Sequence, residues 1–209
     1  QTADPAALKS LNSGNYQAVV LYTFGDYLDP AGIDALASFV RGGGGLVGIH
    51  TALATNPASD TLGKLLGARI VKGVIGHHKI AIADAEHPIV HRVQEFRMDD
   101  ELYVTEKKSD FRTFLTTWFD DRLQPMGWSR NEGKGRVVYL GNGHTVAGLT
   151  HPTFKQLLGR SVRYAAGEDW SDRTVKCAAV GYGQEFKMAK LHLQSAERSR
   201  FKAVAVCDI

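Results

Sequence analysis

GGGGLVGIHTA, residues 42–52, gives the strongest indication of the fold class of this chain. Within it, Leu46–Ile49 is a continuous apolar run next to glycines, which is typical of a strand buried on both faces of a parallel sheet. The run leads directly to His50 and a turn of small residues. In many α/β proteins the side chain at such a corner lies at the carboxyl end of the sheet, where ligands bind. His50 is therefore a candidate site residue, although a lone histidine after a strand is more often structural.

The segments on either side complete an α/β pattern. Residues 18–22 (AVVLY) form another continuous apolar run, and residues 30–41 predict an amphipathic helix with Asp29 as its N-cap. A strand, a helix and a strand with short connections favour a right-handed crossover and a parallel sheet. Residues 136–140 predict a further strand, and residues 152–167 predict a helix that ends at a glycine.

Two other segments set the domain boundaries. Residues 87–123 alternate polar and aromatic side chains without helical periodicity, which indicates strands and long loops laid over the sheet edge. Residues 168–174 are charged and have no apolar period, as expected of a linker. We therefore divide the chain into a first domain at residues 1–167 and a second unit at residues 175–209.

Composition restricts the class of protein. The 209 residues are 44% hydrophobic and 22% charged, and no apolar run approaches the roughly 20 residues of a membrane helix. The net charge of +3 is spread among acids, so we expect neither a nucleic acid nor a membrane partner. Cys177 and Cys207 lie in apolar strand-like runs and are interpreted as core. We expect a cytoplasmic protein; a secreted or periplasmic location and a homo-oligomer stay open.

Four motifs follow the GIHTA corner in order: Gly76-His77-His78, His87-Pro88-Ile89, Asp100-Glu101-Leu102-Tyr103 and Leu140-Gly141-Asn142-Gly143-His144. Together the five motifs cover roughly residues 15–167. In order and spacing they resemble the trehalose-utilisation (ThuA) family, a relative of the class I glutamine amidotransferases. The resemblance implies an α/β, flavodoxin-like (class I glutamine amidotransferase-like) parallel sheet flanked by helices.

The same resemblance implies a cleft lined by His50, His77 or His78, Glu101 and His144; of the two adjacent histidines we prefer His77. Chemistry independently favours such a set, because histidine titrates near neutral pH and serves as general acid, general base or metal ligand. A carboxylate beside it orients the ring or binds the same metal. We predict His50, His77, Glu101 and His144 as catalytic residues. His50, His77 and Glu101 are also predicted ligands of a divalent metal such as zinc.

Some of the residues in these motifs also fit structural roles, and the sequence differs from the families that it resembles in two respects. Asp100 and Glu101, taken singly, fit a solvated surface or a salt bridge equally well. His87 and His151 precede prolines and are interpreted as turn residues. Neither cysteine lies near the corner, so the nucleophile of a glutamine amidotransferase is absent and that chemistry is excluded. ThuA-like proteins usually begin with a further βα unit, so we expect part of the cleft to be missing here.

The carboxyl-terminal segment predicts the opening βαβ of a Rossmann domain. It contains predicted strands at residues 175–180 and 203–207, a Gly181-Tyr182-Gly183 turn and a helix at residues 188–195. Gly181 and Gly183 would lie at the pyrophosphate of a dinucleotide and Asp208 at a ribose hydroxyl. VKCAAVGYG and AVAVCDI are similar to the start of the Gfo/Idh/MocA oxidoreductases. The unit stops too early to work, so NAD(P) is expected only in a full-length parent.

The two resemblances together imply carbohydrate metabolism. Oxidation of a sugar at C3 acidifies the hydrogen on C2 and places the C1 substituent β to the ketone, so acid and base groups suffice to eliminate a glycosidic bond. We predict that the first domain acts on such keto-sugars or glycosides, with His50 and Glu101 as acid/base or metal-binding groups and His144 orienting the substrate. The rival hypothesis is a non-catalytic module that docks the dehydrogenase or binds carbohydrate through Trp118 and Trp128. A nicotinamide-dependent enzyme ranks third, because the nucleotide half is incomplete.

Overall fold

A computed structural model describes residues 5–11, 14–168, 175–180 and 201–207 of the chain. The helices are α1 (Pro30–Arg41), α2 (Asp60–Leu66), α3 (Val146–Thr150) and α4 (Pro152–Ala165), with 3-10 turns η1 (Pro5–Ser10), η2 (His50–Ala54) and η3 (Pro88–Val90). The strands are β1 (Ala18–Leu21), β2 (Gly45–Ile49), β3 (Ala68–Ile82), β4 (Phe96–Lys107), β5 (Arg112–Phe119), β6 (Arg122–Glu132), β7 (Gly135–Leu140), β8 (Val175–Val180) and β9 (Phe201–Cys207).

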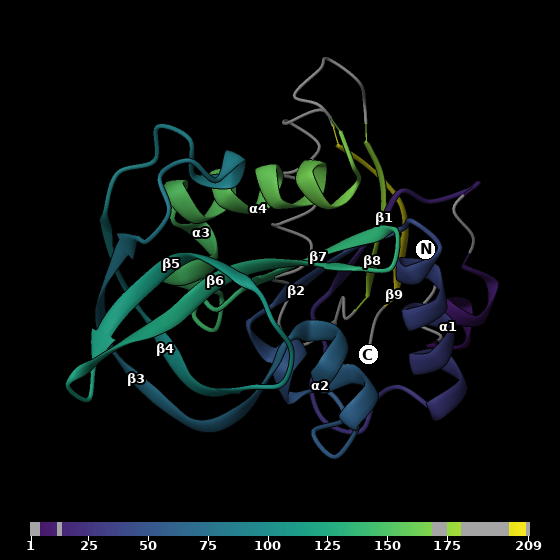
Figure 1. Cartoon of the computed structure of the whole chain (residues 1–209), viewed down its shortest axis with the longest axis horizontal. Coiled ribbons are helices and arrows are strands. Elements are labelled where there is room, and N and C mark those ends of the chain that lie inside the picture. Colours follow the sequence, from purple (N-terminus) through teal and green to yellow (C-terminus); the bar gives the residue numbers. More distant parts are fainter. Residues whose placement is uncertain (1–4, 12–13, 169–174, 181–200, 208–209) are drawn as a thin grey trace.

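All nine of these strands belong to one sheet, in the order β4-β3-β5-β6-β7-β2-β1-β8-β9 (Figure 1). The strands β7, β2, β1, β8 and β9 run parallel, which confirms the predicted α/β core. The strands β3 to β6 extend the same sheet with antiparallel pairs, so the sheet is mixed and not parallel throughout. β5 and β6, and likewise β6 and β7, are joined by two-residue turns, which allow only antiparallel neighbours.

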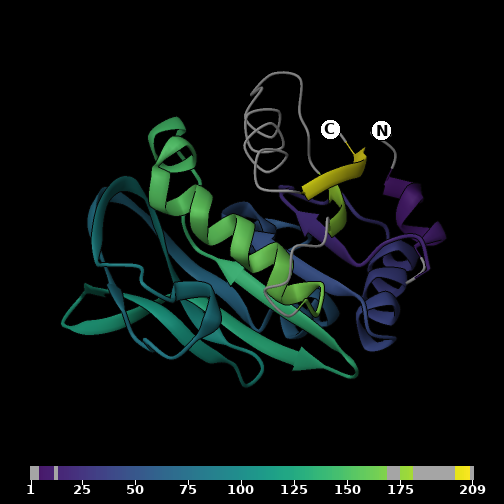
Figure 2. The same cartoon turned by 90° about the horizontal axis from the view of Figure 1, so that it is seen from above.

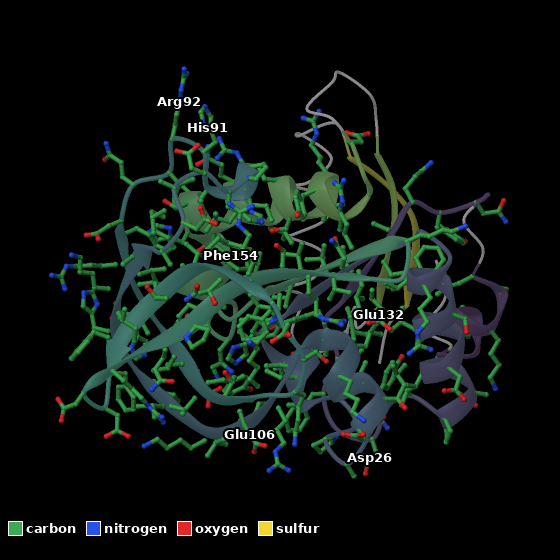
Figure 3. The ribbon with its side chains drawn as sticks, viewed as in Figure 1. Asp26, His91, Arg92, Glu106, Glu132 and Phe154 are labelled. Carbon is green, nitrogen blue, oxygen red and sulfur yellow. The ribbon has the colours of Figure 1, made fainter. Side chains whose placement is uncertain are left out.

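Helices cover both faces of the parallel part of the sheet. Leu36 of α1 packs in the same apolar cluster as Leu46 of β2, and α2 belongs to this side. Phe154 of α4 is buried in the cluster on the other side, together with Val47 of β2, and points from its helix toward the sheet (Figure 3). Figure 2 shows α4 lying along the sheet on this side. Successive residues of β2 therefore enter opposite cores, which is why its whole sequence is apolar or glycine.

The glycine run before β2 is explained by close packing. A Cβ atom on Gly45 would lie 2.4 Å from the carbonyl oxygen of Ala165 in α4, and one on Gly44 would lie 2.2 Å from the ring of Phe39 in α1. Gly43 has a φ of +116°, a conformation that side chains rarely allow. These glycines let the two flanking helices approach the strand that ends at His50.

The carboxyl-terminal strands match two of the predicted elements. β8 pairs with β1, and β9 pairs with β8, both in parallel. The predicted helix at residues 188–195 and the predicted nucleotide-binding residues Gly181, Gly183 and Asp208 lie outside the described residues. The division of the chain after residue 167 stays a prediction. None of the helices in the described ranges is long and apolar enough to cross a membrane.

Candidate functional site

His50 lies at the carboxyl end of β2, between the ends of β1 and β7. Its backbone has a φ of +36°, a left-handed conformation that costs a residue other than glycine on the order of 1–3 kcal/mol. The phenol of Tyr139 in β7 donates a 2.9 Å hydrogen bond to the carbonyl oxygen of His50. The side chain of His50 is fully buried. The predicted strand-to-corner placement of this histidine is therefore present, and neighbouring strands hold it in a strained conformation.

Both ring nitrogens of His50 have partners. Nδ1 lies 2.8 Å from the carbonyl oxygen of Gly141, which can only accept, so Nδ1 carries a proton. Nε2 lies 3.1 Å from Oε2 of Glu101 in β4. The ring stacks on Tyr103 with 4.1 Å between the ring centroids. Burial lowers the pKa of His50, and the Gly141 carbonyl and the carboxylates of Asp100 and Glu101 act in the opposite direction.

Glu101 joins the two candidate histidines. Its Oε2 atom also lies 3.2 Å from Nδ1 of His144. We call His50, Glu101 and His144 the histidine cluster; one ligand atom from each lies within 4.8 Å of the other two. Their side chains are 0%, 17% and 42% exposed respectively, so the cluster opens to solvent on the side of His144. Gly73 of β3 makes room for the carboxylate, because a Cβ atom there would lie 2.1 Å from Oε1 of Glu101.

Asp100 holds the loop that carries His144. Its carboxylate is buried and accepts hydrogen bonds from the backbone nitrogens of Gly143, His144 and Thr145, at 2.6, 3.0 and 2.9 Å. The phenol of Tyr22 donates to the carbonyl oxygen of Gly143 from the end of β1. From the sequence alone, Asp100 fits a solvated surface or a salt bridge. The structure instead shows a buried carboxylate whose partners are backbone groups.

The two adjacent histidines of β3 lie outside the histidine cluster. His77 faces Asp99 across the β3–β4 pair, with 2.7 Å between Nδ1 and Oδ1, and both side chains are exposed. His78 is buried, and its Nε2 lies 3.3 Å from the carbonyl oxygen of Val74. The predicted ligand set of His50, His77 and Glu101 is therefore not brought together, and His144 takes the place expected for His77.

His87 and His151 are structural, as predicted. Nδ1 of His87 accepts from the backbone nitrogen of Ile89, which caps η3, and Nε2 then donates to Oγ of Ser129 at 2.8 Å. Burial lowers the pKa of His87 to about 4. His151 caps α4 by accepting from the backbone nitrogen of Thr153.

The two tryptophans proposed to bind sugar differ in exposure. Trp128 is fully buried, stacks on Phe111 and Tyr139, and donates from Nε1 to the carbonyl oxygen of Leu66. It is a core residue and cannot stack on a ligand. Trp118 is 66% exposed on β5.

Comparisons with known proteins agree with this fold. A ThuA-like protein from Parabacteroides merdae ATCC 43184 is 21% identical with a TM-score of 0.67, over 78% of this chain and 75% of that chain. A ThuA-like protein from Bacteroides uniformis ATCC 8492 is 19% identical with a TM-score of 0.63, over 78% and 76%. A cytoplasmic protein from Salmonella typhimurium is 14% identical with a TM-score of 0.61, over 79% and 76%. At these identities the likeness shows the fold alone.

The sequence itself was also compared with protein families and with curated proteins. The search of curated proteins found no match. The family described as ThuA, trehalose utilisation, matches residues 1–165. The match ends before the predicted Rossmann unit, whose likeness to the Gfo/Idh/MocA oxidoreductases stays a prediction. Because the matched range is most of the chain, the protein belongs to the ThuA trehalose-utilisation family.

Proposed function

We propose that this protein processes keto-sugars or related glycosides at the histidine cluster. Membership in a trehalose-utilisation family supports a carbohydrate substrate. The observation that carries the chemistry is the contact of one oxygen of Glu101 with two imidazoles, at 3.1 and 3.2 Å, beside the carboxyl ends of parallel strands. Proton transfer between a carboxylate and imidazoles requires contacts of this length.

The reaction follows from the chemistry of a sugar oxidised at C3. The C2–H bond breaks as a base takes the proton, a C1–C2 double bond forms, and the C1–O bond of the glycoside breaks. The departing oxygen receives a proton from an acid. Glu101 and His144 are the partly exposed members of the cluster and are the groups that reach the substrate. His50 is fully buried, so it acts through Glu101 by exchanging or sharing its proton.

A C3 ketone must be supplied by an oxidation, which supports a link to a sugar dehydrogenase. In a working dehydrogenase unit, Gly181, Gly183 and Asp208 would bind NAD(P)+, which would accept a hydride from C3 of the sugar, and the first domain would then cleave the resulting ketone. This part of the proposal rests on the sequence resemblance of residues 175–209, and those three residues lie outside the described ranges.

One observation favours a non-catalytic alternative. Trp118 on β5 and Leu123 on β6 face each other across the strand pair, and their exposed fractions are 66% and 59%. An exposed aromatic ring beside an aliphatic side chain suits the apolar face of a sugar ring. A module that binds carbohydrate or docks a dehydrogenase would use this surface.

Turnover of a 3-keto-disaccharide and of its unoxidised parent tests the proposal. We expect the wild-type protein to consume the keto-sugar alone. Glu101→Gln should lower kcat by roughly 100-fold or more, the usual contribution of a general acid or base. His77→Ala, which removes a histidine outside the cluster, should leave the rate unchanged. No turnover of either sugar, together with sugar binding that Trp118→Ala abolishes, would favour the non-catalytic module.

A further inference from the structure

We propose that the histidine cluster is a binding site for one divalent transition-metal cation of the zinc type, held by Nε2 of His50, Oε2 of Glu101 and a ring nitrogen of His144. The inference rests on the geometry of these side chains and not on the substrate class proposed above. It also replaces the ligand set expected from sequence, because His77 is paired with Asp99 on the exposed part of β3.

The tautomer of His50 determines which of its ring nitrogens can bind a metal. Nδ1 donates its proton to the carbonyl oxygen of Gly141, 2.8 Å away. In the neutral ring, Nε2 therefore presents a lone pair, and it faces a carboxylate oxygen of Glu101 at 3.1 Å. Two lone pairs at this distance repel unless a positive centre lies between them. The contact requires either a shared proton or a bound cation.

The spacing of the donor atoms fits a cation. Zinc binds histidine nitrogen and carboxylate oxygen at about 2.0–2.2 Å, which places neighbouring ligands of a tetrahedral site roughly 3.3–3.5 Å apart. The observed separations from Oε2 of Glu101 are 3.1 Å to Nε2 of His50 and 3.2 Å to Nδ1 of His144. All three donor atoms lie within 4.8 Å of one another, so binding needs the two imidazoles to adjust until every pair of ligands reaches the tetrahedral spacing.

The types of donor atom and the exposure of the cluster indicate which kind of cation can bind. Two imidazoles and one carboxylate suit zinc and other first-row transition metals, whereas magnesium and calcium prefer oxygen ligands alone. The cluster supplies three protein ligands and opens at His144, which leaves a position for a substrate oxygen. A cation there would supply Lewis-acid polarisation of that oxygen, and Glu101 and His144 would then serve as its ligands and not as the proton-transferring groups.

The surroundings of the ligands support the same inference. A metal-binding histidine usually donates its second ring N–H to a carbonyl or carboxylate, and His50 does so to Gly141. Tyr103 stacks on His50 with 4.1 Å between the ring centroids, so it helps to fix the orientation of that ligand. The strained backbone of His50 is a further sign that this imidazole is held in place for a purpose other than packing.

Metal binding can be measured without any activity assay. The full chain is freed of metal with a chelator and then titrated with Zn²⁺ by calorimetry and with Co²⁺ by visible absorption. We expect one equivalent to bind, and the cobalt spectrum to show the strong ligand-field bands of a four- or five-coordinate site. Mg²⁺ under the same conditions should give no heat. Absence of a cobalt spectrum and of zinc binding would overturn the proposal.

Variants assign the ligands. Glu101→Gln and His144→Ala alter partly exposed side chains and should each weaken Zn²⁺ affinity roughly 100-fold or more, beyond the 10–100-fold typical of residues that only orient a ligand. His77→Ala is the matched control and should bind as the wild type does, with thermal melts showing that all three proteins are folded. Equal affinity in all of them would place the metal elsewhere and refute the site.

A proton shared between His50 and Glu101 can be distinguished from a bound cation by NMR. In ¹⁵N spectra of the imidazoles, a cation leaves Nε2 of His50 without a proton, and one equivalent of Zn²⁺ shifts that resonance. If both ring nitrogens of His50 stay protonated after zinc is added, the cluster is a hydrogen-bonded acid/base group without metal. That outcome would overturn this inference and leave the proposed sugar chemistry standing.

Discussion

Asp100 and Glu101 are neighbours on β4; Asp100 contacts the backbone of His144, and Glu101 contacts its side chain. The buried carboxylate of Asp100 accepts from its backbone nitrogen, and the carboxylate of Glu101 lies against its ring. Successive residues of a strand point to opposite faces, so the dipeptide divides the two tasks between the two faces of β4. The position of His144 therefore depends on a residue that does not belong to the cluster.

Replacing Asp100 by asparagine tests this division. The amide keeps one oxygen, which can still accept from His144 and Thr145, whereas its NH2 group would face the backbone nitrogen of Gly143 and leave it without an acceptor. We expect a loss of about 2–4 kcal/mol in the free energy of unfolding, measured by urea denaturation, because hydrogen bonds to charged groups contribute most. Metal affinity and turnover should fall with it, because His144 loses its fixed position.

Asp99→Asn is the control for that experiment. Asp99 is the preceding residue on the same strand, but its side chain is 75% exposed and contacts the exposed His77. Pairs of this kind contribute roughly 0–1 kcal/mol. If Asp100→Asn costs no more than Asp99→Asn, the three backbone contacts do not anchor the loop.

Gly73 offers a way to move Glu101 without changing its chemistry. In Gly73→Ala the new Cβ atom would lie 2.1 Å from Oε1, so the carboxylate has to swing away from the two imidazoles. We expect kcat/KM on the keto-sugar to fall roughly 100-fold, the effect of misplacing a reacting group by about 1 Å. Cobalt affinity should fall as well, while the thermal melt stays close to that of the wild type.

Gly76→Ala is the matched change three residues along β3. A Cβ atom on Gly76 would meet its nearest neighbour, the ring of His78, at 3.5 Å, an ordinary contact. This variant should keep the activity and the metal affinity of the wild type. Equal losses in both variants would mean that alanine disturbs β3 itself and that Gly73 has no particular relation to Glu101.

The parallel core was predictable because its strands carry their signal locally. The runs at residues 18–22 and 46–49 are apolar on both faces, which only a central strand between two helical layers requires. The antiparallel extension gave a weaker signal. Most residues of β3 are exposed or half-buried, and β5 pairs with β6 through two register shifts that interrupt the alternation of polar and apolar residues. Pairing partners in such strands depend on contacts distant in sequence.

The sequence indicated most residues of the candidate site, but it did not indicate which of them are in contact. His50 and Glu101 stood out by motif, but they are 51 residues apart and no spacing indicates that they touch. His77 was an equally plausible member until the register of β3 and β4 placed Asp99 opposite it. Asp100 was missed because the sequence around an aspartate does not show whether its carboxylate is buried or solvated. Its one signal was the Asp-Glu pair inside a strand, where one of two neighbouring side chains has to face inward.

The burial of His87 predicts how the free energy of unfolding changes with pH. Its ring is buried against Phe114 and Tyr164 and accepts from Ile89, and burial lowers its pKa to about 4. An unfolded chain would protonate this histidine near its ordinary value of about 6.5. Between about pH 6.5 and 4 the unfolded state therefore binds more protons than the folded state, and the free energy of unfolding falls as the pH falls.

One such group contributes a slope of at most about 1.4 kcal/mol per pH unit across that window. His87→Asn keeps an oxygen near the position of Nδ1 that can cap η3, has no atom that reaches Ser129, and does not titrate. Urea denaturation of both proteins from pH 7 to pH 4 should give a variant that is less stable at pH 7 and loses less stability on acidification. Because all other titrating groups are shared, the difference between the two slopes isolates His87. Parallel curves would show that His87 is protonated in the folded protein as easily as in the unfolded chain, and that its burial has no effect on its titration.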